Sequence, residues 1–199
     1  MPPNVPNEEI LSRRLNRRCW YLFSGSWLTW LWLAGWAVCA SAQVHKEYQI
    51  KAAFLYNFTK FVDWPAHRFA DANSPFVIGV FGNNPFGDEL VKVLKDRKIN
   101  GREFMVKTVN TADEALTTHL LFIGQAEKKR LPGLLPVLQK TGVLTVGECD
   151  PFVTQGGIIN FLMEEDKIRF EINLNSAEQS GLKISAQLLK LAKVVHKKT

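Results

Sequence analysis

The chain has 199 residues, which is enough for one domain with a substantial core. Its composition, with 46% hydrophobic and 22% charged residues and no low-complexity run, excludes a largely disordered protein. The formal net charge of +6 is spread thinly along the sequence. The basic stripe that nucleic-acid binding needs is missing, so we expect no nucleic-acid partner.

The first 42 residues have the order of regions found in an export signal. Arginine pairs at 13–14 and 17–18 precede an uncharged apolar stretch over residues 20–38, and Ala40-Ser-Ala42 follows. Basic, hydrophobic and small-residue regions in this order are typical of a secretory signal peptide. We therefore predict that residues 1–42 are a signal peptide cleaved after Ala42, and that the rest is periplasmic. A lipoprotein signal at Cys39, twin-arginine export and an uncleaved anchor are the alternatives.

Cys149 is the one cysteine outside this leader, so the remaining chain cannot form an internal disulfide. A core built from about 150 residues can be stable without one. We expect Cys149 to be a small buried thiol, with an intermolecular disulfide or a reactive thiol as the alternative.

The segment from Glu47 to Pro65 predicts an aromatic helix. Its apolar residues recur at helical spacing and cover a face wider than the ~100° of an ordinary surface helix. This face comprises Tyr48, Ile50, Ala52, Phe54, Leu55, Phe58, Phe61 and Val62, and the polar side comprises Gln49, Lys51, Asn57 and Lys60. Pro65 ends the helix, because proline disfavours the helical conformation of the residue before it. We expect the helix to complete the core and to leave Tyr48 and Trp64 as surface for a dimer or a partner.

Four segments then carry strand patterns, over residues 76–81, 102–109, 119–124 and 142–147. Helical patterns separate them over residues 88–98, 111–116 and 126–140. In the shortest of these, Thr111 is the predicted N-cap and Glu114 stands at the capping-box position. Strands that alternate with helices in this way are typical of a largely parallel sheet.

The last third changes character. Residues 158–163 and 167–174 predict an antiparallel hairpin, because apolar residues alternate with polar ones along its second strand. A final helix, capped by Asn175 or Ser176, is expected to run to residue 195. We therefore predict one α/β domain over residues 43–199. It has a mostly parallel central sheet with helices on both faces and a C-terminal antiparallel hairpin plus helix.

Recognised catalytic motifs are missing from the sequence. It contains no Walker loop, no Gly-x-Ser-x-Gly and no Cys-x-x-Cys, and its four histidines are far apart. The glycine-containing turn over residues 79–87 occupies the place of a phosphate-binding loop but lacks its spacing. We expect no enzyme activity, no cofactor and no metal.

Polar residues that follow the parallel strands define a candidate binding edge, because ligands of open α/β sheets bind beyond the carboxyl ends of the strands. Asn83 and Asn84 follow the first strand, Gln125 follows the third, and Glu148 and Asp150 follow the fourth. They could rim a shallow polar site, or they could be ordinary loop residues with Asp150 in a turn. The candidate residues for partner or ligand binding are Tyr48, Trp64, Asn83, Asn84, Glu148, Asp150 and Phe152.

Five segments of the sequence resemble the YfiR-like family of periplasmic regulatory proteins. They are Tyr48–Pro65, Phe76–Gly87, Gly156–Phe161, Ile168–Leu174 and Gly181–Ala192, and the resemblance covers residues 46–196. It implies a non-enzymatic homodimer that binds and inhibits the sensor domain of an inner-membrane diguanylate cyclase, which lowers cyclic di-GMP and biofilm formation. It also implies release by stress or by an outer-membrane lipoprotein, and another membrane sensor as the partner in some members. Some relatives have paired cysteines, which this chain lacks.

Two other functions stay open from the residues alone. A periplasmic small-ligand-binding protein would use Asn83, Asn84, Glu148 and Asp150. An exported hydrolase would use Glu148 as its base. The resemblance favours the regulator.

Overall fold

A computed structural model describes residues 45–196 of the chain. The chain separates into two units, residues 1–44 and 45–199, so the predicted signal peptide and its cleavage site lie outside the described residues. None of the helices in the described part is long and apolar enough to cross a membrane.

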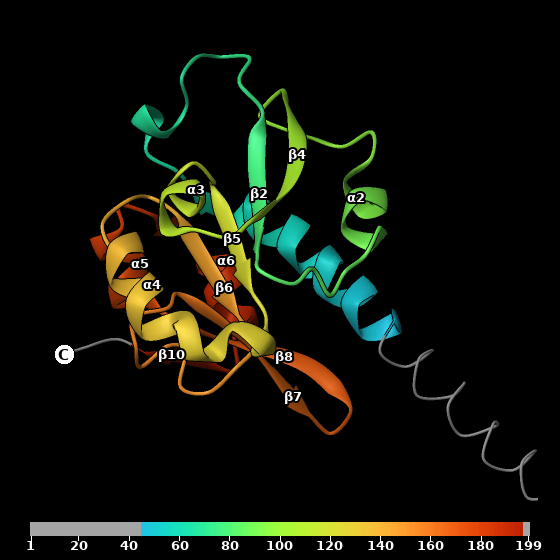
Figure 1. The fold of residues 1–199 in the computed structure, drawn as a ribbon, viewed down its shortest axis with the longest axis vertical. Helices are drawn as coiled ribbons and strands as arrows, with labels where there is room; N and C mark the ends of the chain where they lie inside the picture. Colours follow the sequence, from blue (N-terminus) through green and yellow to red (C-terminus); the bar gives the residue numbers. More distant parts are fainter. Residues whose placement is uncertain (1–44, 197–199) are drawn as a thin grey trace, which may run out of the picture. The chain divides into compact units, whose positions relative to one another are not determined.

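The centre of the described unit is an eight-stranded sheet with the strand order β10-β8-β7-β6-β5-β2-β4-β3 (Figure 1). The strands are β2 Phe76–Phe81, β3 Lys98–Ile99, β4 Arg102–Val109, β5 Leu120–Ile123, β6 Leu144–Gly147, β7 Ile159–Glu164, β8 Lys167–Asn173 and β10 Val194–His196. The neighbouring strands from β7 to β4 are parallel, whereas β8 is antiparallel to β7 and β3 is antiparallel to β4. The predicted fold class, a mostly parallel sheet with an antiparallel hairpin near its C-terminal end, is confirmed.

Helices cover both faces of this sheet. The first face packs against the helix over residues 45–61, α2 Glu89–Leu94 and α6 Ala186–Leu191; the second packs against α3 Ala112–Leu116 and α4 Leu131–Leu138. Successive side chains of a strand point to opposite faces. Leu120 and Phe122 of β5 therefore join the first core, and Leu121 and Ile123 join the second.

The aromatic helix over residues 45–61 covers much of the first face. Leu55 and Phe58 are completely buried, and the Phe58 ring centroid lies 5.8 Å from that of Phe161 and 5.1 Å from that of Phe170. Burial of one such side chain contributes about 1.5–3 kcal/mol. The expectation that this helix completes the core is confirmed.

The aromatic helix ends at residue 61, earlier than the predicted stop at Pro65. Val62–Asp63 form the short strand β1, which pairs antiparallel with β9 Lys183–Ile184. The Ser185 N–H also donates to the Phe61 carbonyl oxygen at 2.9 Å. This pairing takes the backbone groups that another helical turn would use. The chain then passes through the 3₁₀ turn η1 Ala66–Arg68 into β2.

The prediction of one final helix to residue 195 is wrong. The segment comprises α5 Leu174–Gln179, β9, α6 and β10. The N-cap of α5 is Asn173, whose Oδ1 accepts the Ser176 N–H at 3.0 Å, and neither of the two predicted caps has this role. Gly181 reverses the chain with a φ of +71°, a conformation that favours glycine. β10 then pairs in parallel with β8.

The other predicted helices differ in detail. α2 is shorter than the expected 88–98, and the expected helix over 126–140 begins as the 3₁₀ helix η2 Gln125–Arg130 before α4. The Thr111 cap of α3 is confirmed, because its Oγ1 accepts the Glu114 N–H at 3.2 Å.

The β7–β8 hairpin projects beyond its neighbours (Figure 1). β7 pairs with β6 only at Ile159 and Asn160, so the rest of β7 continues past the end of β6. The hairpin closes through Glu165 and Asp166, which have φ angles of 48° and 58°. Two consecutive positive φ angles are typical of a type I′ turn, whose twist matches the flanking strands.

Candidate functional site

A cluster of charged and aromatic side chains lies at the carboxyl ends of the parallel strands. Tyr48 and Lys51 come from the aromatic helix, Gln125 follows β5 and Glu148 follows β6. They border a small hollow of about 200 Å³, which is lined by Glu47, Tyr48, Lys51, Gln125, Glu148, Phe161, Leu162 and Met163.

Glu148 is the centre of this cluster. Its Oε1 accepts hydrogen bonds from the Tyr48 hydroxyl and from the Gln125 N–H, each at 3.0 Å, and its Oε2 lies 2.6 Å from the Lys51 Nζ. The Glu148 side chain is 7% exposed. A carboxylate held by three donors and mostly removed from water has little capacity to act as a general base.

Lys51 corrects the sequence interpretation, which placed it on the polar side of the helix. The residue is buried, its side chain is 6% exposed, and its ammonium contacts both Glu47 and Glu148. Its Nζ also lies 4.7 Å from the Tyr48 ring centroid. Burial of this charge is stabilised by the paired carboxylates and the aromatic ring.

Tyr48 joins the cluster to the core. Its ring packs edge-on against Phe86 at 5.3 Å between centroids, while its hydroxyl donates to Glu148. Burial raises the pKa of the Tyr48 hydroxyl well above its usual range, and the negative charge of Glu148 raises it further. Tyr48 therefore remains a hydrogen-bond donor at any physiological pH.

The two asparagines after β2 do not contact Glu148. The Asn84 side chain stabilises its own turn, because its Oδ1 accepts the Phe86 N–H at 3.0 Å and its Nδ2 donates to the Gly87 carbonyl at 3.3 Å. Asn83 is exposed, and its backbone N–H lies 3.4 Å from Oε1 of Glu127. Their role in binding stays a prediction.

The two candidate residues after Glu148, Asp150 and Phe152, differ in burial. Asp150 is exposed, and its role stays a prediction. Phe152 is completely buried, and a side chain at Gly147 or at Gly157 would collide with its ring. The expectation that Phe152 lies on a binding surface is therefore wrong, because the ring fills the core between these two glycines.

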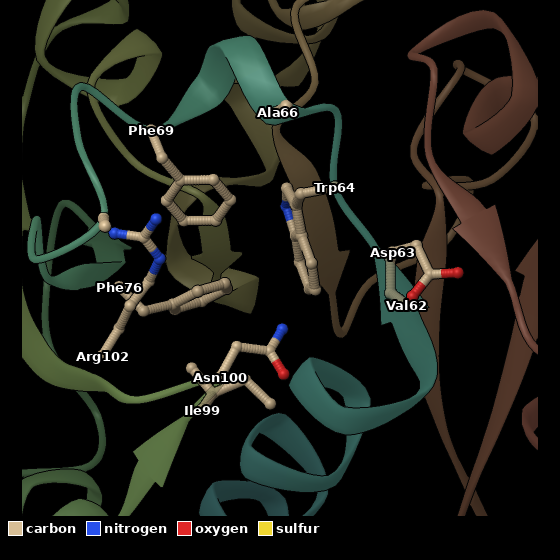
Figure 2. A pocket seen from close by; sticks show the side chains of 10 residues that line it. Val62, Asp63, Trp64, Ala66, Phe69, Phe76, Ile99, Asn100 and Arg102 are labelled. Atoms are coloured by element: carbon tan, nitrogen blue, oxygen red, sulfur yellow. The ribbon is translucent and has the colours of Figure 1, made fainter.

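Trp64 lies apart from the cluster, in a second hollow at the amino ends of the parallel strands (Figure 2). The helix alone puts roughly 20 Å between Tyr48 and its last residue, Phe61, at 1.5 Å per residue, and Trp64 lies beyond that end. Its indole Nε1 donates to the His119 carbonyl oxygen at 3.0 Å. The candidate residues predicted from the sequence therefore line two separate hollows, Tyr48 and Glu148 the first and Trp64 the second.

Lys51 is the residue that the sequence interpretation missed. A spacing that could have revealed it is present, because Tyr48, Lys51, Leu55 and Phe58 follow one another by three, four and three residues. This spacing places Lys51 on the buried face of a helix. A lysine in that position needs an anionic partner, and Glu148 is the carboxylate that the fold supplies.

Cys149 is buried, as expected, and its N–H donates to Oδ1 of the buried Asn160 at 3.1 Å. Burial raises the pKa of its thiol, which lowers its thiolate fraction and its reactivity. Within residues 45–196, no group of three or more His, Cys, Asp or Glu side chains could hold a metal ion.

Two solved structures are similar to part of the chain. The ABC domain in complex with L-Trp from Streptococcus pneumonia has 12% identity and a TM-score of 0.45 over 60% of this chain and 55% of that chain. A conserved domain protein from Vibrio cholerae has 15% identity and a TM-score of 0.45 over 61% of this chain and 55% of that chain. The match therefore spans little more than half the length of either structure.

Comparison with curated proteins gave no match. A family model described as DUF4154, YfiR/HmsC-like, matches residues 48–193, which is nearly all of the described unit.

Proposed function

The chain belongs to the YfiR/HmsC-like family, and from this membership we propose that it is a periplasmic regulator that inhibits an inner-membrane diguanylate cyclase. It binds the sensor domain of the cyclase, lowers cyclic di-GMP and thereby restrains biofilm formation. The observation that carries the proposal is the family match over residues 48–193.

Inhibition by a protein of this kind requires a difference in affinity. A partner shifts a two-state equilibrium only as far as it prefers one state over the other. To move the cyclase from almost fully active to almost fully inactive, the regulator must bind the inactive sensor about 10⁴-fold more tightly.

The surface that we assign to this binding lies beside the Glu148 cluster. It combines the projecting end of the β7–β8 hairpin with the start of the aromatic helix, and it includes Met163 and Ile50, which are 54% and 40% exposed. Exposed apolar side chains next to fixed charged groups are typical of protein-binding surfaces. The buried Lys51–Glu148 pair gives this surface a rigid base.

The regulator needs no catalytic group. The Glu148 carboxylate already accepts three hydrogen bonds from the protein itself, which supports a non-enzymatic role. The proposal includes a homodimer, and an outer-membrane lipoprotein that releases the inhibition. A different membrane sensor in place of the cyclase is the next candidate partner.

Deletion of the gene tests the proposal. Cellular cyclic di-GMP should rise several-fold in the deletion strain and return to its starting level when the chain is expressed again. Unchanged cyclic di-GMP in a strain whose membrane cyclases are intact would overturn the cyclase as the partner.

The alternative, a small-ligand-binding protein with its site at Asn83, Asn84, Glu148 and Asp150, has weaker support. The side chains of Asn84 and Glu148 already hold partners inside the protein. A thermal-shift screen with periplasmic metabolites tests it. A stabilising compound whose effect is lost in Asp150→Ala would favour this alternative over the regulator.

A further inference from the structure

The hollow around Trp64 has the construction of a small-molecule site. It has a volume of about 370 Å³ and is lined by Val62, Asp63, Trp64, Ala66, Phe69, Ala72, Phe76, Ile99, Asn100 and Arg102. Ligand pockets in proteins range from about 300 to 1,000 Å³, so this hollow suits a small ligand. It lies at the opposite ends of the parallel strands from the Glu148 cluster.

Three aromatic rings form its walls, and the protein holds them in place (Figure 2). Trp64 meets Phe76 edge-on with 4.8 Å between ring centroids, and its Nε1 is fixed by the hydrogen bond to His119. Phe69 stacks on the His119 ring at 4.5 Å. Walls that are already ordered bind a flat apolar group with little loss of conformational entropy.

Arg102 supplies the polar group of the hollow. Its Nη1 donates to the carbonyl oxygens of Asp71 and Ser74, each at 2.7 Å, and its Cζ lies 4.2 Å from the Phe69 ring centroid. Nη1 also donates to the Ser74 hydroxyl at 2.9 Å, and all the hydrogen bonds of Arg102 to described residues come from this one nitrogen. Figure 2 shows this guanidinium between Phe69 and Phe76, beside the hollow. A guanidinium held on one side and open on the other presents two parallel donors, which match a carboxylate.

The remaining polar groups favour an anion. The Asp63 carboxylate points away from the hollow, and the Asn100 amide points into it (Figure 2). His119, behind the aromatic wall, has both ring nitrogens in use, because Nδ1 accepts the Val77 N–H at 2.9 Å and Nε2 lies 3.0 Å from the Arg68 carbonyl. Its pKa is lowered mainly by burial, and the positive charges of Arg68 and Arg102 lower it further. The two arginines therefore add positive charge at this end of the sheet.

We propose that this hollow binds a small monocarboxylate with a flat apolar body. The carboxylate lies on the free edge of Arg102, and the apolar body packs against the wall formed by Trp64, Phe69 and Phe76. This site is separate from the proposed surface for the cyclase, and its occupation does not depend on that partner.

The test is calorimetric titration of the purified protein with phenylacetate and with its neutral counterpart phenylacetamide. Phenylacetate should bind at least about tenfold more tightly, because the amide loses a charge-assisted hydrogen-bond pair. Arg102→Gln should remove this preference. Arg97→Gln changes an exposed arginine that stacks on Tyr56 outside the hollow, and it should leave the preference unchanged.

If Arg102→Gln does not fold, the fluorescence of Trp64 in the unmodified protein provides a second measurement of ligand binding. Trp64 is the single tryptophan outside the leader, and its contribution is the difference between the spectra of the protein and of Trp64→Phe. Phenylacetate should change this difference spectrum. Equal binding of phenylacetate and phenylacetamide would overturn the anion site, and no change with either compound at millimolar concentration would overturn the site altogether.

Discussion

The Lys51 ammonium lies 2.6 Å from the Glu148 carboxylate, and both side chains are more than nine-tenths buried. The pair joins two segments that are 97 residues apart in the sequence, the aromatic helix and the end of β6. An isolated charge in this position would be strongly destabilising, so the two residues depend on each other.

Replacement of Lys51 by methionine should destabilise the protein by about 3–5 kcal/mol, because Glu148 is then buried without its cation. Urea unfolding followed by circular dichroism measures the change. The matched control is Lys46→Met, which changes an exposed lysine of the same helix and should cost less than about 0.5 kcal/mol. Equal effects of the two substitutions would show that the buried pair contributes little.

The environment of His119 predicts that the free energy of unfolding falls in mild acid. Its Nδ1 accepts the Val77 N–H, so a proton on Nδ1 would place two donors against each other. The folded-state pKa of His119 is lowered, so the unfolded chain takes up the proton first. The contribution is fully present above about pH 6.5, the unfolded value, and is lost as the pH falls from there toward the folded pKa.

Unfolding free energies measured between pH 7.5 and 5 in about half-unit steps would check this sign. In His119→Gln the fall toward acid should be smaller. His67→Gln, which changes an exposed histidine, should follow the unmodified protein. A wild-type curve that rises toward pH 5, or a His67→Gln curve that flattens instead, would contradict the assignment to His119.

Met163 provides a test of the proposed partner surface. Met163→Glu places a charge on the β7 edge of that surface, and should abolish the lowering of cyclic di-GMP while the unfolding midpoint changes little. Met105→Glu is the matched control, because Met105 is 49% exposed on β4, four strands away in the sheet and thus roughly 19 Å distant. Full activity of Met163→Glu would place the partner elsewhere.

The sequence predicts the strands well because their patterns are local. The pattern predicts the strand over residues 102–109 at its observed bounds and the hairpin strand over 167–174 within one residue. Both signals, β patterning and turn residues, lie within a few positions of each other. The final segment was mispredicted because its pairing is distant. Lys183–Ile184 pair with Val62–Asp63, and Val194–His196 pair with β8, and neither partner is visible in local periodicity.

The sequence predicts some residues of the candidate site but not their contacts, because those contacts join segments that are distant in the sequence. Tyr48 and Glu148 were both named, but their hydrogen bond depends on the packing of a helix across the end of a sheet. The sequence pattern groups Lys51 with the polar side of the helix, and its partner Glu148 is distant in the sequence. Phe152 was assigned to the surface because its place between Gly147 and Gly157 depends on tertiary structure.

The central claim is that the protein acts on a cyclase from the periplasmic side. Purified protein added to spheroplasts of the deletion strain reaches that side of the membrane directly, and intracellular cyclic di-GMP is the quantity to measure. We predict that it falls several-fold with the unmodified protein and with Met105→Glu, and stays high with Met163→Glu. Cyclic di-GMP that stays unchanged with folded, unmodified protein at saturating concentration would contradict the account.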